Sequence, residues 1–300
     1  MGHDPAGRGR GARLVTAGRE IVRATRHDLL AITGNLARAA MHNGREAAVE
    51  LSEALVQKWE RTRPPCRYTV DADWESRMHD MVGAPWPCPE APVFAAVFDE
   101  VVSVLRERGI TVGPDSFVGW SDADPATSRA VWCLTRHLRP STAVETGVAR
   151  GLTTRIILEA MERNRHGRLW SVDLPPQLRP HLNHEIAAAV PYARRGRWTM
   201  IEGSSRHRLG PLLSRLRTVE LFVHDSRHTT RNLRFELTQA WRHLRVGGVA
   251  VADDIDLNHG LPAFRAATTG HRVLIAAAEL PDPNRCDGRG LFAVIGRPDS

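Results

Sequence analysis

Lysine, clustered cysteine and long apolar runs are scarce in this chain of 300 residues, and each scarcity argues against a class of function. Because no run of 18 apolar residues occurs, the sequence predicts no membrane-spanning helix. The four cysteines show neither a CxxC motif nor a Cys/His zinc spacing, so nothing indicates a disulfide framework or a zinc site. Cys133 lies in an apolar helical pattern and is expected in the core. The basic N-terminus is not followed by an uninterrupted apolar segment, so a cytoplasmic location is expected.

The chain is basic, with a formal net charge of +7, but the charge is not gathered in one place. Lys58 is the only lysine, and the arginines are interleaved with acidic residues in every segment. No basic stretch alternates with aromatic residues, as a groove for nucleic acid would require. An arginine-rich, solvated surface is therefore expected, with no nucleic-acid partner.

Composition divides the chain into four parts. Residues 1–12 form a Gly/Arg-rich leader that is expected to be disordered. Residues 13–62 show a helical pattern with apolar residues seven apart, which predicts helices that pack on the main domain or on a second subunit of a homo-oligomer. Residues 63–119 comprise a Pro/Trp-rich stretch and a helix, and residues 120–300 form the main domain.

The stretch 63–92 carries six prolines in its sequence RPPCRYTVDADWESRMHDMVGAPWPCPEAP, and these argue against regular structure. Two interpretations remain open. It is either a structured linker or a lid that covers the substrate with large apolar side chains, namely Trp74, Met78, Met81 and Trp86.

The main domain alternates strands with helices, which predicts an α/β fold with a doubly wound, mostly parallel seven-stranded sheet. The expected strands are 142–146, 168–172, 198–202, 219–224, 248–252, 272–277 and 291–296. The expected helices of the chain from residue 93 on are 93–108, 122–138, 153–165, 182–189, 208–216, 231–244 and 262–269.

A glycine turn follows the first expected strand, in the stretch AVETGVARGLTT that ends at Thr154. Gly147 allows a sharp reversal of the chain, and Gly151 allows a helix to approach a ligand without a Cβ atom in the way. Ala149 stands where a dinucleotide-binding turn has its second glycine, which argues against an NAD site. Strand, glycine turn and helix N-terminus together predict a site for a ligand beside the turn.

Polar residues follow the other expected strands, at the edge of the sheet where ligands of such folds bind. Asp173 lies 26 residues beyond Gly147, at a distance suited to an acid that accepts hydrogen bonds from ribose hydroxyls. Later strand ends supply Gly203 with Ser204 or Ser205, then Asp225 with His228, and finally Asp253 with Asp254. Three carboxylates at adjacent strand ends would repel one another, and a Mg²⁺ ion between them would remove that repulsion.

These motifs resemble those of class I S-adenosylmethionine (SAM) methyltransferases, which have a Rossmann-like fold. The glycine turn is similar to that of the catechol O-methyltransferase type. The pattern Asp225-x-x-His228 with Asp253-Asp254 looks closest to the metal-dependent branch that includes macrolide-sugar O-methyltransferases. The resemblance covers roughly residues 120–298 and implies an antiparallel terminal strand pair.

The resemblance also implies roles for individual residues. It assigns the methionine end of SAM to Glu145, Gly147, Gly151 and Thr153, the ribose to Asp173, and the adenine to Gly203 and Ser204. Asp225 is also expected to contact the cofactor. It assigns Mg²⁺ to Asp225, Asp253 and Asp254, and the catalytic base to His228. A lysine base is ruled out because Lys58 lies outside the domain. The implied activity is O-methylation of a small molecule such as a sugar, macrolide or other natural product.

Two alternatives stay open at this point. One is an NAD(P)-dependent oxidoreductase on a similar sheet, which Ala149 and the lack of a Tyr-x-x-x-Lys pair disfavour. The other is a SAM-fold binding protein without catalytic activity, for which mutation of the three aspartates would change no reaction.

Overall fold

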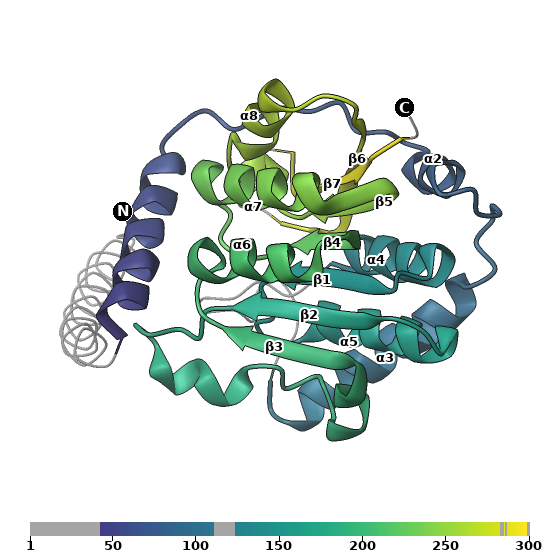
Figure 1. Ribbon diagram of the computed structural model, residues 1–300, viewed down its shortest axis with the longest axis horizontal. Helices are drawn as coiled ribbons and strands as arrows, with labels where there is room; N and C mark the ends of the chain where they lie inside the picture. The colour runs from purple at the N-terminus through teal and green to yellow at the C-terminus, as the bar shows by residue number, and fades with distance from the viewer. Residues whose placement is uncertain (1–42, 111–123, 283–284, 286, 299–300) are drawn as a thin grey trace, which may run out of the picture.

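The computed structural model describes residues 43–110, 124–282, 285 and 287–298. The expected leader 1–12 and much of the expected helical segment 13–62 lie outside these residues. A seven-stranded sheet in the order β3-β2-β1-β4-β5-β7-β6 organises the described chain (Figure 1). The strands are β1 (Thr142–Thr146), β2 (Arg168–Asp173), β3 (Trp198–Glu202), β4 (Val219–His224), β5 (Leu244–Ala252), β6 (Arg272–Pro281) and β7 (Arg289–Gly296).

The predicted fold class is confirmed. Neighbouring strands from β3 to β5 are parallel, and β7 pairs antiparallel with both β5 and β6. The central strands β1 and β4 are buried on both faces, which explains why they read as short apolar runs and not as alternating patterns. Because the parallel strands run in one direction, their carboxyl ends share one edge of the sheet.

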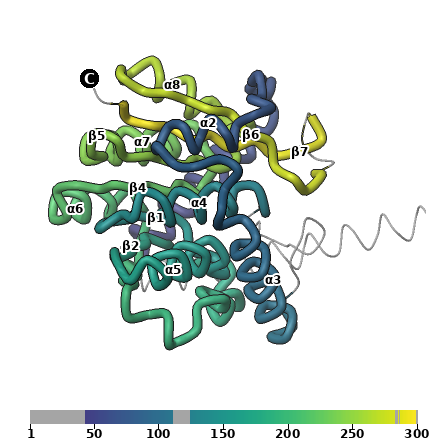
Figure 2. Tube along the Cα trace, turned by 90° about the vertical axis from the view of Figure 1, so that its right-hand side faces the viewer, coloured from purple at the N-terminus to yellow at the C-terminus, as the bar shows by residue number. Residues whose placement is uncertain are grey.

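Helices cover both faces of the sheet (Figures 1 and 2). One face carries α4 (Pro125–Leu138) and α5 (Leu152–Asn164), with α3 (Ala91–Glu107) packed against both. The other face carries α6 (Ser205–Leu216), α7 (Thr230–His243) and α8 (Gly260–Ala267). Within the described ranges, no helix is long and apolar enough to cross a membrane.

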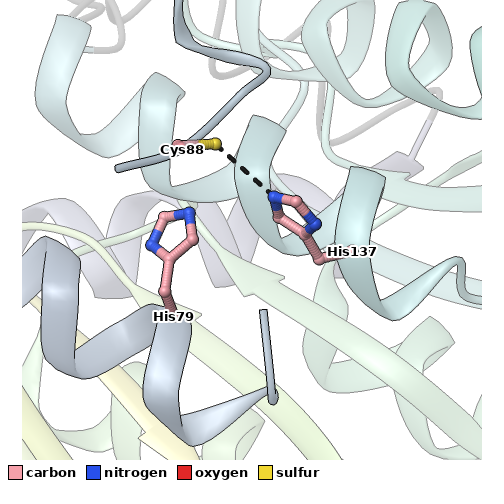
Figure 3. A group of neighbouring side chains, drawn as sticks. All are labelled: His79, Cys88 and His137. Atoms are coloured by element: carbon pink, nitrogen blue, oxygen red, sulfur yellow. Dashed lines mark hydrogen bonds between the residues drawn. The ribbon is translucent and has the colours of Figure 1, made fainter. Parts of the chain in front are cut away.

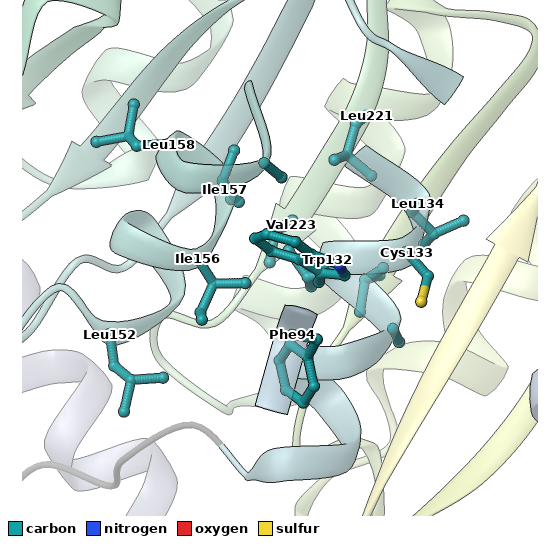
Figure 4. Close-up of a cluster of buried hydrophobic side chains, with 14 of the residues drawn as sticks. Phe94, Trp132, Cys133, Leu134, Leu152, Ile156, Ile157, Leu158, Leu221 and Val223 are labelled. Atoms are coloured by element: carbon teal, nitrogen blue, oxygen red, sulfur yellow. The ribbon is translucent and has the colours of Figure 1, made fainter. Parts of the chain in front are cut away.

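A large apolar core lies between the sheet and the layer of α3, α4 and α5 (Figure 4). Trp132 of α4 is fully buried at its centre, and its ring lies 6.3 Å from that of Phe94. A second core fills the opposite face under α6, α7 and α8. These two cores hold the sheet rigid and so fix the positions of the strand ends.

One predicted helix is wrong. Residues 182–189 form a 3₁₀ helix, η1 (Pro180–Glu185), followed by turns. Ala187 has a left-handed backbone with φ of 55°, which an α-helix cannot contain. The backbone N–H of Ala187 donates to the carbonyl of Ala149, so this segment is held against the glycine turn instead. Two further 3₁₀ helices are η2 (Tyr192–Arg197) and η3 (Ile255–Leu257).

The Pro-rich stretch contains a helix that the sequence analysis missed, α2 (Trp74–Met81), which packs on β6 (Figure 2). The prolines lie on either side of these eight residues, so they did not prevent a helix there. Met78 is buried, and the Trp74 ring meets that of Phe292 edge-on at 5.2 Å. Trp74 and Met78 therefore belong to the core, and the interpretation of these two side chains as a lid is wrong.

The N-terminal helix (residues 43–60) stands across the edge where the strands end (Figure 1). Its contacts reach the segments that follow β2, β3 and β4. This helix packs on the main domain, which was one of the two expectations for segment 13–62.

Candidate active site

The turn after β1 brings two strand ends into close contact. Gly147 has a φ of +87°, and a Cβ atom on it would lie 2.0 Å from the carbonyl oxygen of Asp225. Any other residue here would push β1 and β4 apart. The next turn residue, Ala149, donates its N–H to the carboxylate of Asp173 at 3.2 Å. The turn therefore links β1 to the acidic residue at the end of β2.

Gly151 makes a close packing contact within the protein. Its φ is +82°, and a Cβ atom would lie 2.9 Å from the Val190 side chain and 3.0 Å from the Cα of Ala187. The close approach that requires glycine is thus made by the protein's own segment after η1. Gly151 permits that packing and does not line the cavity described below.

Glu145 also lies behind the cavity. It is completely buried, and its Oε2 accepts hydrogen bonds from Thr154 at 2.8 Å and Ser171 at 2.6 Å. Burial raises the pKa of its carboxyl to about 7, although the two hydroxyl groups oppose that rise. Glu145 thus ties α5 to β2, and the neighbouring Thr153 is likewise buried outside the lining.

A cavity of about 1190 Å³ opens at the carboxyl ends of the strands, and we call it the strand-end cavity. It gathers most of the residues that the sequence assigned to the cofactor, metal and base. Those in its lining are Gly147, Asp173, Ser204, Asp225, His228, Asp253 and Asp254. Gly203 lies beside the lining, where the side chain of Arg208 approaches its Cα. One site is therefore built from five segments that are distant in sequence.

Asp173 lines this cavity at the end of β2. Burial raises the pKa of its carboxyl to about 6, against the effect of hydrogen bonds from the backbone N–H groups of Ala149 and Val148. Its backbone carbonyl accepts from the N–H of Gly203 at 2.8 Å, which joins the ends of β2 and β3. Asp173 is therefore held in place by backbone groups on both sides.

Asp225, Asp253 and Asp254 form an acidic cluster at the ends of β4 and β5. The strands are paired in register, and the N–H of Asp253 donates to the carbonyl of His224 at 3.0 Å. Burial raises the pKa of Asp225 well above its ordinary value, and repulsion from Asp253 and Asp254 raises it further. The predicted convergence of these three aspartates in one cavity is what the structure describes.

His228 reaches the same cluster from the segment before α7. Its Nε2 lies 3.6 Å from Asp254 Oδ2 and 4.0 Å from Asp225 Oδ1. Its Nδ1 is buried without a hydrogen-bond partner. Burial lowers the pKa of the imidazole to about 4, while the charge of Asp254 acts in the opposite direction. The ring is therefore neutral at neutral pH.

Arg285 also enters the cluster, and the sequence analysis did not identify it. Its guanidinium pairs with Asp254, with Asp256 at 3.2 Å and with Asp282 at 3.1 Å. Arg285 thus supplies part of the positive charge that the sequence argument assigned to a metal alone. It lies in the connection that follows β6, whose carboxyl end is at the same edge of the sheet, but none of the motifs used in the sequence analysis includes an arginine after this strand.

The N-terminal helix supplies one wall of the cavity, and the sequence analysis missed its polar face. Four glutamates project from this helix into the domain and are buried there: Glu46, Glu50, Glu53 and Glu60. Their spacings of four, three and seven residues place them on one helical face. The spacing of the glutamates is visible in the sequence, but the helical pattern of residues 13–62 was defined from apolar residues alone.

Each of these carboxylates accepts hydrogen bonds from a strand-end segment. Glu46 accepts from the N–H of Ser204 at 3.1 Å, and Glu60 accepts from the N–H of Thr230 at 3.0 Å. These N–H groups belong to the N-termini of α6 and α7, where the helix dipole favours negative charge. Ser204, which the sequence placed beside the adenine, is therefore already in contact with Glu46.

Comparison with known proteins agrees with this geometry. Residues 144–255 match a family model described as a methyltransferase domain. No curated protein matches the chain. Residues 144–255 are therefore assigned to a methyltransferase domain, and the sheet order is that of the class I SAM-dependent methyltransferase fold.

Solved structures with a similar arrangement include three methyltransferases. The O-methyltransferase TomG from Streptomyces achromogenes, involved in tomaymycin synthesis and solved with SAM, is 14% identical, with 68% of this chain and 90% of TomG covered and a TM-score of 0.48. An O-methyltransferase from Bacillus cereus, solved with SAH, is 13% identical. The match covers 74% of this chain and 97% of the Bacillus protein, with a TM-score of 0.47. The SAH-bound methyltransferase PaMTH1 from Podospora anserina is 12% identical. The match covers 78% of this chain and 99% of PaMTH1, with a TM-score of 0.46.

Proposed function

We propose that this protein transfers the methyl group of SAM to a hydroxyl oxygen of a small molecule, such as a sugar, a macrolide or another natural product. One observation carries the proposal. The glycine turn and Asp173, which suit a nucleoside cofactor, share the strand-end cavity with His228 and the acidic cluster, which suit proton removal. A cofactor and an acceptor could therefore meet there.

The cofactor would lie along the ends of β1, β2 and β3. Asp173 would accept hydrogen bonds from the ribose hydroxyls, and the turn at Gly147 would lie beside the methionine end. Gly203 and Ser204 would border the adenine. Glu145, Gly151 and Thr153 lie behind these groups, so their effect on the cofactor would pass through the turn and the N-terminus of α5.

His228 would accept the proton of the acceptor hydroxyl. A neutral ring nitrogen can take a proton, and the nearby carboxylates of Asp254 and Asp225 would stabilise the imidazolium that forms. The acceptor oxygen would attack the methyl carbon as the bond from that carbon to sulfur breaks, which leaves S-adenosylhomocysteine. A base held in position contributes on the order of 100-fold or more to the rate.

The acidic cluster offers the donors that a divalent cation prefers, although its three carboxylates do not all lie within 4.8 Å of one another in this structure. Asp225, Asp253 and Asp254 offer only carboxylate oxygens, the ligands that Mg²⁺ prefers. The same residues would hold the ion, with Asp254 shared between it and Arg285. When bound, Mg²⁺ would supply positive charge that lowers the pKa of the acceptor hydroxyl. Arg285 also makes the cluster tolerable without a metal, so dependence on Mg²⁺ is a separate question from activity.

The test is SAM turnover against a panel of sugars, macrolides and phenols, measured as S-adenosylhomocysteine formed. His228→Ala should reduce turnover on the order of 100-fold while SAM binding is kept. His166→Ala, an exposed histidine far from the cavity, serves as the control. If His228→Ala turned over normally while Asp253→Asn did not, His228 would not be the base. If neither variant changed the turnover of an accepted substrate, the acidic cluster would have no part in catalysis.

A further inference from the structure

Two histidines and two cysteines lie together on the side of the domain away from the strand-end cavity. His79 belongs to α2, Cys88 lies in the connection before α3, and Cys133 and His137 lie one turn apart on α4. None of the four lines the cavity. Three of them are buried and His137 is partly buried. The proposed methyl transfer therefore gives this group no role.

The side chains of His79, Cys88 and His137 converge on a small volume (Figure 3). One side-chain nitrogen or sulfur from each of His79, Cys88 and His137 lies within 4.8 Å of the others. The Cys88 sulfur lies 3.5 Å from His137 Nε2 and 3.2 Å from the sulfur of Cys133. Cys133 and His137 are four residues apart, so they project from the same face of α4.

His79 is oriented as a metal-binding histidine is. Its Nδ1 lies 2.7 Å from the backbone carbonyl of Glu75, which can only accept, so Nδ1 carries the proton. The other nitrogen, Nε2, is then left with a free lone pair. It is buried and has no hydrogen-bond partner. A carbonyl on one ring nitrogen and a metal on the other is the usual arrangement for a histidine ligand.

The distances agree with a tetrahedral zinc site. With Zn–S of about 2.3 Å and Zn–N of about 2.05 Å, tetrahedral angles place sulfur and nitrogen about 3.6 Å apart and two sulfurs about 3.8 Å apart. The Cys88–His137 distance of 3.5 Å meets the first value. The Cys88–Cys133 distance of 3.2 Å is shorter than the second and longer than a disulfide bond. Cys133 lies outside the group of three whose ligand atoms are within 4.8 Å of one another, so its side chain would turn toward that group on binding.

We propose that His79, Cys88, Cys133 and His137 bind one Zn²⁺ ion as a closed structural site. Four protein ligands leave no open position, so the ion takes no part in the reaction. Its role is to hold α2 and the segment before α3 against α4. The sequence analysis gave no sign of this proposed site, for a physical reason. The four ligands come from three separate elements, and spacings of nine and 45 residues between them match no short motif.

The experiment measures the zinc content of the purified full-length protein after dialysis against a weak chelator. Wild-type protein should retain about one zinc per chain, and Cys88→Ser and Cys133→Ser should each retain less than about a tenth of that. Cys66→Ser is the matched control, because Cys66 is a free cysteine outside the group. It should retain the wild-type zinc content.

A second measurement, the unfolding temperature with and without zinc, uses wild-type protein and so does not depend on whether the variants fold. Wild-type protein should unfold at a lower temperature after removal of zinc by a strong chelator, and added Zn²⁺ should restore the original temperature. Cobalt exchanged into the site should show the strong visible absorption of tetrahedral Co²⁺ with thiolate ligands. The proposal would be overturned if purified wild-type protein contained no zinc and mass spectra of its unreduced peptides showed a Cys88–Cys133 disulfide. A zinc content that Cys88→Ser and Cys133→Ser leave unchanged would also overturn it.

Discussion

Replacement of Glu53 by alanine tests how the N-terminal helix is held to the strand-end cavity. The side chain of Glu53 is almost fully buried, and its Oε2 accepts a hydrogen bond from the Thr229 hydroxyl at 2.6 Å. Its Oε1 pairs with Arg231 at 2.7 Å and with Arg206 at 3.5 Å. The substitution removes all three contacts together and leaves the Thr229 hydroxyl buried.

The size of the effect follows from these contacts. A hydrogen bond to a charged group contributes about 1.5 to 3 kcal/mol, and the buried Thr229 cannot turn to water when it is lost. The two arginines are about two-fifths exposed, so their ion pairs add little. We expect Glu53→Ala to lower the free energy of unfolding by about 2 to 3 kcal/mol, which corresponds to roughly 4 to 12 °C in Tm for a domain of this size.

The assay is thermal and urea unfolding of the full chain, combined with hydrogen exchange of residues 43–60. Hydrogen exchange should show the helix less protected in Glu53→Ala. Lys58→Ala is the control, because Lys58 lies on the exposed side of the same helix. It should change the free energy of unfolding by less than about 0.5 kcal/mol. Equal stability and equal protection in wild type and Glu53→Ala would refute the view that buried carboxylates dock this helix.

Three other changes have defined outcomes. Gly147→Ala should destabilise the fold by more than about 3 kcal/mol in urea unfolding, because its Cβ would meet the Asp225 carbonyl, whereas Gly196→Ala, with open space around it, should be nearly neutral. Glu145 has a folded pKa raised to about 7, so the stability of the wild type should fall as pH rises from about 4.5 to 7. Glu145→Gln should lose that pH dependence, which amounts to about 3 kcal/mol, and parallel Tm profiles for the two proteins would contradict it. Arg285→Ala should lower the Mg²⁺ concentration required for half-maximal turnover at least about tenfold, because a competing cation is gone; an unchanged requirement would show that the ion does not bind beside Asp254.

The fold was predictable because short apolar runs bounded by turn residues alternate with helical patterns along the main domain. β1, β3 and β4 have the predicted bounds. The helix α2 was missed because flanking prolines dominated the composition of its segment, although its own eight residues contain none. The stretch 182–189 was misread because its backbone bonds to the glycine turn, a tertiary contact that no local pattern reveals.

The candidate site was predictable where chemistry follows strand ends. Asp173, Asp225 and Asp253 are brought to one cavity by parallel pairing alone, which the order of strands and helices implies. Arg285, which follows β6, also lines this cavity, as do Glu50, Glu53 and Glu60 of the N-terminal helix. The positions of these residues depend on how distant segments pack together. The spacing of the glutamates could indicate that they share one helical face, but not which part of the domain that face contacts.

The most direct test of the central claim is calorimetric titration of the full-length protein with SAM. We predict saturable binding of one SAM per chain, weakened at least about tenfold in Asp173→Ala because the ribose hydroxyls lose their acceptor. Lys58→Ala should bind as the wild type does. Wild-type protein that gives no heat with SAM, or Asp173→Ala that binds SAM as tightly as the wild type, would contradict the placement of the cofactor in the strand-end cavity.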